Sequence, residues 1–402
     1  MRGGDMSGGD VSNDGMNGLQ MHFVNGSVVT PGALLDGATI TVDGDRIVAI
    51  DPLDRAATDA IDRVVDLGGG WLVPGFVDTQ VNGGGGVLLN DQPTVEGIAA
   101  IGAAHLPYGT TAFMPTLISD TPDVIAATLD AMDAAIEAGV PGVVGAHIEG
   151  PWINPSRKGI HDPAKFRLLD DAMIELLIRP RKGRVMVTLA PELTDPASIA
   201  RLVAGGVIVS AGHTDADYET IIDAVGAGLT GITHLFNAMS PLLHRAPGVV
   251  GAALDDRHVY CGLIADGLHV HDAALRLALN ARPNDRLMLV SDAMPSVGAV
   301  DKDFRLQGRL IHVEDGKCFG EDGTLAGSDL DMAGAVRNFV ARTPADVPAA
   351  AAMAATNPAA VLGLGHERGA LAPGLRADWV ALTADLWPAG TWIGGQLVAG
   401  RT

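Results

Sequence analysis

Four polar residues that can bind a metal ion or carry a proton stand at the ends of short apolar runs. The runs are 143–149 ending in Glu149, 207–213 ending in His213, 231–234 ending in His234, and 287–292 ending in Asp292. If these runs are parallel strands of one barrel, their carboxyl ends meet at one rim, where barrel enzymes keep their active sites. A glutamate, two histidines and an aspartate at one rim predict a metal-dependent hydrolase.

Glu149, His213 and His234 are the predicted metal ligands. Two neutral imidazoles and one carboxylate, with a position left for water, suit a catalytic Zn²⁺, and Fe²⁺, Co²⁺ or Mn²⁺ would also fit. Either histidine alone could be an ordinary polar group at a strand end, but the three together favour a metal site. Asp292 is the predicted general base, because a carboxylate beside a metal-activated water can take its proton. Considered locally, Asp292 could instead cap a helix.

Eight strand-like runs, mostly separated by helical patterns, must position these residues. They are Gly75–Asn82, Thr110–Thr116, Val143–Glu149, Val185–Ala190, Val207–His213, Gly231–His234, Tyr260–Ala265 and Leu287–Asp292. Helical patterns such as Val124–Ala138 and Ala216–Gly228 connect them. Eight strand–helix units in about 290 residues predict a closed (β/α)8 TIM-like barrel. A hairpin over Arg309–Gly323 and helices over Ser328–Arg342 and Pro348–Leu362 are expected after the eighth strand.

Both ends of the chain carry short strand and turn patterns, unlike the middle. Runs 23–30 and 38–50, the second with an Asp43-Gly44 hairpin signal, resemble runs 377–382 and 391–398. We therefore predict a small β-sandwich domain formed by both chain ends. The expected organisation is a flexible leader over 1–20, the β-sandwich over 21–73 and 363–402, and the (β/α)8 metallohydrolase barrel over 74–362.

Composition limits the partners and the compartment. The 402 residues carry a formal net charge of -21, which repels nucleic acid and anionic membranes but leaves a small anionic substrate possible. Cys261 and Cys318 lie far apart, which argues against a disulfide framework and a cysteine-rich zinc site. The N-terminus lacks the profile of a signal peptide, and no apolar stretch is long enough to span a bilayer. We expect a soluble cytoplasmic protein.

Several motifs, in the right order, resemble those of N-acetylglucosamine-6-phosphate deacetylases in the amidohydrolase superfamily. The resemblance extends from about residue 21 to the end of the chain. It is highly specific, because several motifs occur together and in the right order. The matching segments are PGFVDTQVNG at 74–83, HIEGPW at 147–152 followed by KGIH at 158–161, SAGHT at 210–214, THLFNAM at 233–239, IADGLH at 264–269 and GTLAGS at 323–328.

This resemblance implies hydrolysis of the acetamide of N-acetyl-D-glucosamine 6-phosphate to glucosamine 6-phosphate and acetate. It implies Glu149, His213 and His234 as metal ligands and Asp292 as general base and then acid. His161 would contact the substrate carbonyl and stabilise charge on its oxygen. The residues implied to hold the sugar phosphate are Asn237, the Ala238 backbone, His269 and Arg245. In the family this arginine comes from the neighbouring subunit, which implies a homodimer with shared sites.

The first strand departs from the wider superfamily at two positions. Many amidohydrolases have His-x-His there, helping to hold a second metal, whereas this chain has Gln80-Val81-Asn82. Amide side chains are poor ligands for zinc-class ions. The matching subset of the family works with one metal, so one divalent ion per subunit is predicted. Gln80 and Asn82 are then expected to contact substrate.

The sequence leaves three alternative functions to compare with this hypothesis. The sequence does not decide the epimer at C4 of the sugar, so N-acetylgalactosamine 6-phosphate is an alternative substrate. A cyclic-amide hydrolase of the dihydroorotase or hydantoinase type is disfavoured, because His-x-His and a bridging lysine are missing. A catalytically silent barrel acting as a binding protein or scaffold would have lost ligands or the base, and this chain keeps them all.

Overall fold

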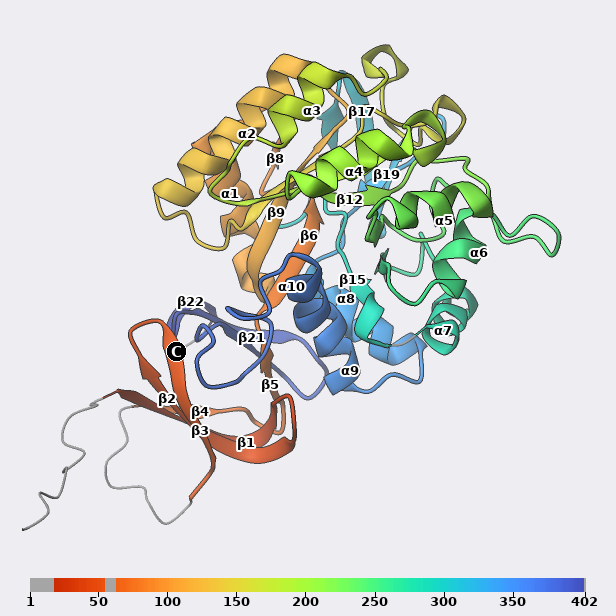
Figure 1. Cartoon of the computed structure of the whole chain (residues 1–402). Coiled ribbons are helices and arrows are strands. Elements are labelled where there is room, and N and C mark those ends of the chain that lie inside the picture. Colours follow the sequence, from red (N-terminus) through yellow and green to blue (C-terminus); the bar gives the residue numbers. More distant parts are fainter. Residues whose placement is uncertain (1–17, 55–62, 283, 401–402) are drawn as a thin grey trace, which may run out of the picture.

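In the computed structural model of the chain, residues 18–54, 63–282 and 284–400 are described. The chain forms a barrel of strands and helices with a second, strand-rich domain at one end (Figure 1). The leader predicted over 1–20 lies almost entirely outside the described residues. None of the helices in the described ranges is long and apolar enough to cross a membrane.

The barrel is built, within the described residues, from eight parallel strands in the order β15, β14, β13, β12, β11, β10, β9, β6. Their side chains are almost all buried, as expected for parallel strands covered on both faces. A parallel bridge between Val81 and Ala293 brings the two edges of the sheet together. The predicted (β/α)8 TIM-like barrel is confirmed. The strands are β6 Phe76–Val81, β9 Thr110–Ile118, β10 Gly145–Glu149, β11 Arg184–Leu189, β12 Ile208–Ala211, β13 Gly231–Ile232, β14 Tyr260–Leu263 and β15 Leu287–Leu289.

Helices cover the outside of the barrel (Figure 1). Several begin where a side chain accepts a hydrogen bond from the first turn, as Thr121 does for α2 and Asp217 for α5. The stretch predicted as one late helix is helical from 347 to 361, with a π-helical segment at 352–356. The helices are α1 Val95–His105, α2 Pro122–Glu137, α3 Asp171–Leu177, α4 Pro196–Ala204, α5 Tyr218–Gly226, α6 Gly248–Asp255, α7 Asp272–Ala281, α8 Met332–Arg342, α9 Val347–Ala351 and α10 Asn357–Val361.

The second domain is a sheet to which both chain ends contribute. In the described part of the chain its order is β22, β21, β20, β5, β1, β2, β3, with β4 also paired to β1. Its separate core includes Phe23, which packs edge-on against Trp379 with ring centroids 5.7 Å apart. The domain boundaries at 73/74 and 362/363 stay predictions. The strands are β1 Leu19–Val29, β2 Leu34–Asp43, β3 Arg46–Pro52, β4 Arg63–Asp66, β5 Trp71–Pro74, β20 Trp379–Leu382, β21 Pro388–Ile393 and β22 Gln396–Gly400.

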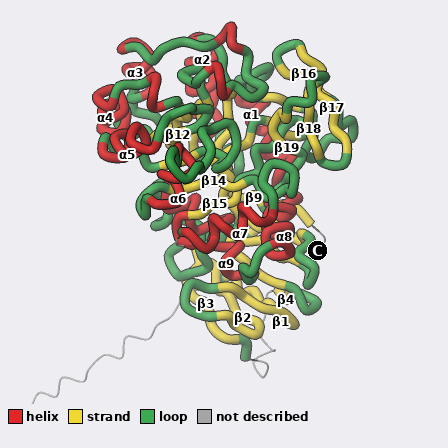
Figure 2. The backbone as a smooth tube through the Cα atoms, turned by 90° about the vertical axis from the view of Figure 1, so that its right-hand side faces the viewer, coloured by secondary structure: helices red, strands yellow, loops and turns green. Residues whose placement is uncertain are grey.

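A small antiparallel sheet follows the eighth barrel strand and lies beside the barrel (Figure 2). It contains β16 Phe304–Leu306, β17 Arg309–Glu314, β18 Lys317–Gly320 and β19 Leu325–Ser328, so the predicted hairpin at 309–323 is the centre of a larger element. Its apolar side chains pack against Ile160 and Met294, which lie close to the barrel rim. A short pair, β7 Gly83–Gly84 and β8 Val87–Leu88, follows the first barrel strand.

Candidate active site

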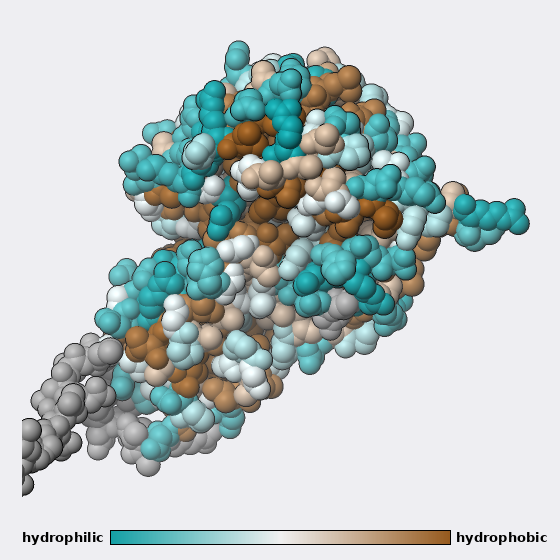
Figure 3. All heavy atoms as spheres, viewed as in Figure 1, coloured by the Kyte–Doolittle hydropathy of each residue, from teal (hydrophilic) through white to brown (hydrophobic). Residues whose placement is uncertain are grey.

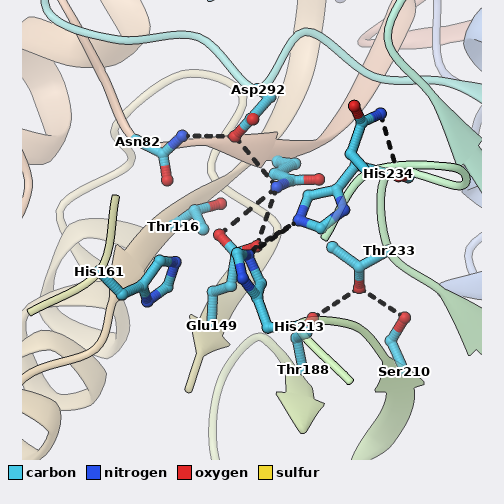
Figure 4. A network of polar contacts seen from close by, with 12 residues as sticks. Asn82, Thr116, Glu149, His161, Thr188, Ser210, His213, Thr233, His234 and Asp292 are labelled. Carbon is cyan, nitrogen blue, oxygen red and sulfur yellow. Dashed lines mark hydrogen bonds and ion pairs between the residues drawn. The ribbon is translucent and has the colours of Figure 1, made fainter. Parts of the chain in front are cut away.

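Glu149, His213, His234 and Asp292 lie together at the carboxyl ends of the barrel strands (Figure 4). Glu149 is the last residue of β10, but the other three follow their strands by two or three residues. Those three have positive φ angles of 49°, 34° and 52°, in the order of the chain. The left-handed backbone conformation costs a non-glycine residue roughly 1–2 kcal/mol of free energy, so contacts with the surrounding structure must stabilise it. The expectation that these residues end the strands is thus corrected, because each stands in the turn that follows.

The two imidazoles and the Glu149 carboxylate form a set of converging ligand atoms. Glu149 Oε1 lies 3.0 Å from Nε2 of His234 and 3.3 Å from Nε2 of His213, and the two Nε2 atoms are 3.1 Å apart. A tetrahedral ion with bonds of about 2.0–2.1 Å holds its ligand atoms roughly 3.3 Å apart. The three residues are all buried and form, within the described structure, a group that could hold a metal ion. Their spacing and chemistry fit a divalent metal ion.

The protonation of His213 also fits metal binding. Its Nδ1 lies 2.8 Å from the backbone carbonyl oxygen of Arg157. A carbonyl oxygen only accepts hydrogen bonds, so Nδ1 carries the proton. Nε2 is then the ring nitrogen that faces Glu149 and His234, and it is the atom that would bind a metal.

Glu149 is ionised in this site. Burial alone would raise its pKa, but hydrogen bonds from His213 and His234 outweigh burial and hold the pKa well below its usual range. The Glu149 side chain is 3 % exposed, so this charge sits in a largely dry environment. A buried carboxylate needs a compensating positive charge, which a bound cation would provide.

Asp292 stands in the turn after the eighth strand, faces the predicted metal ligands and is held by two amides. Its Oδ1 accepts hydrogen bonds from Nδ2 of Asn82 at 2.8 Å and from Nε2 of Gln80 at 3.0 Å. Burial, and then the nearby Glu149 charge, raise the pKa of Asp292 to about 6. A carboxylate with that pKa is well matched to proton transfer near neutral pH.

His161 is placed to donate a hydrogen bond into the site. Its Nδ1 lies 2.8 Å from Oγ of Ser119 and accepts from the Ser119 backbone N–H at 3.4 Å. Because that N–H can only donate, the ring proton is on Nε2. Burial, together with the adjacent His213, lowers the pKa of His161 to about 3, so the ring is neutral. The rings of His161 and His213 have centroids 4.4 Å apart.

A cavity of about 380 Å³ opens over these residues. Of the predicted substrate contacts, Asn82, Asn237, Ala238 and His269 line it, together with the predicted metal ligands, Asp292 and His161. His269 Nδ1 and Oδ2 of Asp266 are hydrogen-bonded at 2.6 Å. The structure therefore brings most of the predicted site residues around one cavity.

Two predicted substrate contacts lie elsewhere. Gln80 is absent from the described lining of the cavity, and its amide contacts Glu149 and Asp292 instead. Arg245 is exposed, in the loop between β13 and α6. This loop projects from the barrel in Figure 1, and its tip is hydrophilic in Figure 3. Arg245 does not line the cavity described for its own chain.

Sequence reasoning missed the residues that orient the predicted ones. Asp266 had a signal, because it stands three residues before His269 in the same motif and pairs with it across a turn. Ser119 and the Arg157 carbonyl had none, since they reach their histidines from other loops. Ser210 and Thr188, which both contact the Thr233 hydroxyl beside His234, likewise come from separate strands (Figure 4).

The chain is similar to known proteins over almost all of its length. A model of the amidohydrolase family matches residues 71–398. The N-acetylgalactosamine-6-phosphate deacetylase of Shewanella sp. (strain ANA-3) is 40% identical over 92% of this chain and 94% of that protein. The N-acetylglucosamine-6-phosphate deacetylase of Bos taurus is 37% identical over 94% of this chain and 95% of that protein.

A solved structure agrees with these sequence matches. The N-acetylglucosamine-6-phosphate deacetylase from Pasteurella multocida superposes with a TM-score of 0.90 at 33% identity, covering 95% of this chain and 100% of that one. The match extends over both the barrel and the strand-rich domain. Together with the family match, it shows that the chain belongs to the amidohydrolase family.

Proposed function

We propose that this enzyme hydrolyses the acetamide of N-acetyl-D-glucosamine 6-phosphate, giving D-glucosamine 6-phosphate and acetate. The observation that carries the proposal is the meeting of Glu149, His213 and His234 with Asp292 at one cavity of about 380 Å³. The cavity is of a size to hold one hexosamine phosphate. The deacetylases from Shewanella and Bos taurus, which are 40% and 37% identical to the chain, support deacetylation of an N-acetylhexosamine 6-phosphate.

The roles of the individual residues follow from their positions. A divalent ion bound by Glu149, His213 and His234 would polarise the amide carbonyl and acidify a water molecule. Asp292 accepts the proton of that water and then gives a proton to the departing amine. Since two amides hold its Oδ1, we assign the proton transfer to Oδ2. His161 donates its Nε2–H to the carbonyl oxygen as negative charge develops there.

We assign the sugar phosphate to the part of the cavity lined by Asn237, Ala238 and His269. The Asp266 carboxylate holds Nδ1 of His269, which leaves Nε2 as the ring nitrogen that can contact a phosphate oxygen. Arg245 would complete this subsite from a second subunit of a homodimer. Its exposure on a projecting loop, away from its own cavity, supports that arrangement.

N-acetylgalactosamine 6-phosphate is the second candidate substrate. The 40% identical relative from Shewanella is named for that sugar, which differs only in configuration at C4. The test is acetate release from N-acetylated hexosamines of both epimers, each with and without the 6-phosphate. Highest kcat/KM on the glucosamine 6-phosphate derivative supports the main proposal, and highest kcat/KM on the galactosamine derivative replaces it. No release from any of them overturns both.

One metal ion per subunit is expected, with Zn²⁺ favoured and Fe²⁺, Co²⁺ or Mn²⁺ as alternatives. The reason is that Gln80 and Asn82 stand where a second metal would need ligands, and amide side chains are poor ligands for zinc-class ions. Elemental analysis of protein loaded with each ion and desalted should reach about one equivalent. Two equivalents, both required for acetate release, would contradict this prediction.

The acid side of the pH profile should report Asp292. Only the carboxylate accepts a proton, so kcat/KM should fall as the pH drops through the pKa of Asp292. That pKa is raised to about 6, and a bound cation would favour the carboxylate and lower it. The acid limb is therefore expected at or below pH 6 with the natural metal. A limb well above pH 6 would assign the titration to another group.

We also propose a cytoplasmic location. Cys261 and Cys318 are both buried and unpaired in the structure, which suits a reducing compartment.

A further inference from the structure

Glu192 lies on the loop after β11 and connects the loops that follow three neighbouring barrel strands. Its Oε1 accepts hydrogen bonds from Nδ2 of Asn154 at 2.9 Å and from the backbone N–H of Asp215 at 2.6 Å. Its Oε2 accepts a hydrogen bond from Oγ1 of Thr214. The loops after β10 and β12 are thus both tied to one half-buried carboxylate. The proposed reaction gives this carboxylate no role.

All three partners of Glu192 are connected to His213, either along the chain or by a hydrogen bond. Thr214 and Asp215 are the next two residues of the chain, and they follow the left-handed turn at His213. The backbone N–H of Asn154 donates to the His213 carbonyl oxygen at 2.8 Å. His213 therefore sits in a turn whose hydrogen bonds converge on Glu192.

The same loop after β10 supplies the acceptor for the His213 ring. The Arg157 carbonyl accepts from Nδ1, and the Arg157 guanidinium pairs with Oδ1 of Asp215 at 2.7 Å. The backbone N–H of Asp215 also donates to Glu192. A shift of the Glu192 carboxylate would therefore move both the turn at His213 and the Arg157 carbonyl that accepts from the His213 ring.

We infer that Glu192 is a positioning residue for the metal centre. It holds the His213 turn in its strained conformation and keeps the ring proton on Nδ1, so that Nε2 faces Glu149 and His234. A carboxylate suits this role because its two oxygens can accept from all three donors, whereas an amide accepts through one oxygen only. The inference rests on the proposed function only in taking Glu149, His213 and His234 as metal ligands.

The test is metal affinity, measured without substrate. Co²⁺ titrated into metal-free Glu192→Ala protein should bind about 10–100-fold more weakly than to wild type, as for other partners of metal-bound histidines. The Co²⁺ absorption bands should also change, because the ligand field reports the direction of His213 Nε2. Glu219→Ala is the matched control, since Glu219 is an exposed glutamate on the nearby helix α5. It should bind Co²⁺ like wild type.

A second pair of variants separates positioning from general damage to the fold. Thr214 is fully buried, and Thr214→Val keeps the shape of the side chain but removes the hydroxyl that donates a hydrogen bond to Glu192. Thr214→Val should weaken Co²⁺ binding in the same direction as Glu192→Ala, and Thr214→Ser should restore it. If Glu192→Ala does not fold, the Co²⁺ affinities of Thr214→Val and Thr214→Ser decide whether Glu192 positions His213. Co²⁺ binding as tight as wild type in Glu192→Ala or Thr214→Val overturns the inference.

Failure of the proposed function gives a different result. Wild-type protein that binds Co²⁺ but releases no acetate from any hexosamine phosphate would overturn the reaction, and the affinity loss in Glu192→Ala would still stand. Normal acetate release by wild type, with unchanged affinity in the variants, would overturn the role of Glu192 alone.

Discussion

Asp292→Asn should lower kcat for acetate release by on the order of 10²–10⁴-fold or more, while the metal content stays at the wild-type level. The amide has nearly the same size, and its oxygen can still accept from Gln80 and Asn82. It cannot take a proton from water or return one to the amine. The measurement is kcat together with metal per subunit on the same sample.

The control for this variant is Asp301→Asn. Asp301 is an exposed aspartate in the segment after the eighth strand, and its change should leave kcat and metal content unaltered. If Asp292→Asn keeps more than about a tenth of wild-type kcat, a different group is the base. If it loses metal as well as activity, Asp292 contributes to metal binding, and its assignment as base alone is wrong.

The position of Asp292 shows what the sequence could reveal. Parallel strands buried on both faces leave near-continuous apolar runs, and the polar residue that ends each run marks the rim. That logic found Glu149, His213, His234 and Asp292 as one group. It placed the strand ends too late, since β12 stops at Ala211 and β13 at Ile232. A left-handed turn leaves no pattern of apolar residues in the sequence. The apolar runs alone therefore could not show where the hydrogen bonding between strands stops.

The contacts that orient these four residues could not be predicted from the sequence either, because they join loops that are far apart in the chain. Glu192 meets Asn154 and Thr214 only because three loops close over the same rim, and nothing in their sequence separation encodes that meeting. The same holds for Ser119 and His161. The motifs predicted the chemistry of the first contacts with metal and substrate, and the fold was needed to supply the residues that hold them.

Arg245→Ala should weaken kcat/KM for the 6-phosphate by about 2–4 kcal/mol, a factor of roughly 30 to 900, if the guanidinium pairs with the phosphate in a dry site. The slow reaction of unphosphorylated N-acetylglucosamine should hardly change, because it has no phosphate to lose. Arg257→Ala, which removes an exposed arginine beyond helix α6, should leave both rates at the wild-type level. Equal losses on both sugars would mean that Arg245 does not recognise phosphate.

Mixing subunits then tests whether Arg245 acts across a dimer. If the protein is the proposed homodimer, an Arg245→Ala homodimer should be weak and an Asp292→Asn homodimer should be inactive. In a heterodimer, however, the site with an intact Asp292 would receive an intact Arg245 from its partner. That site has the full set of proposed residues, so activity on the 6-phosphate should partly return when subunits exchange. Size-exclusion chromatography with differently tagged subunits shows whether the heterodimer forms. If it forms and no activity returns, Arg245 serves its own subunit or does not bind phosphate at all.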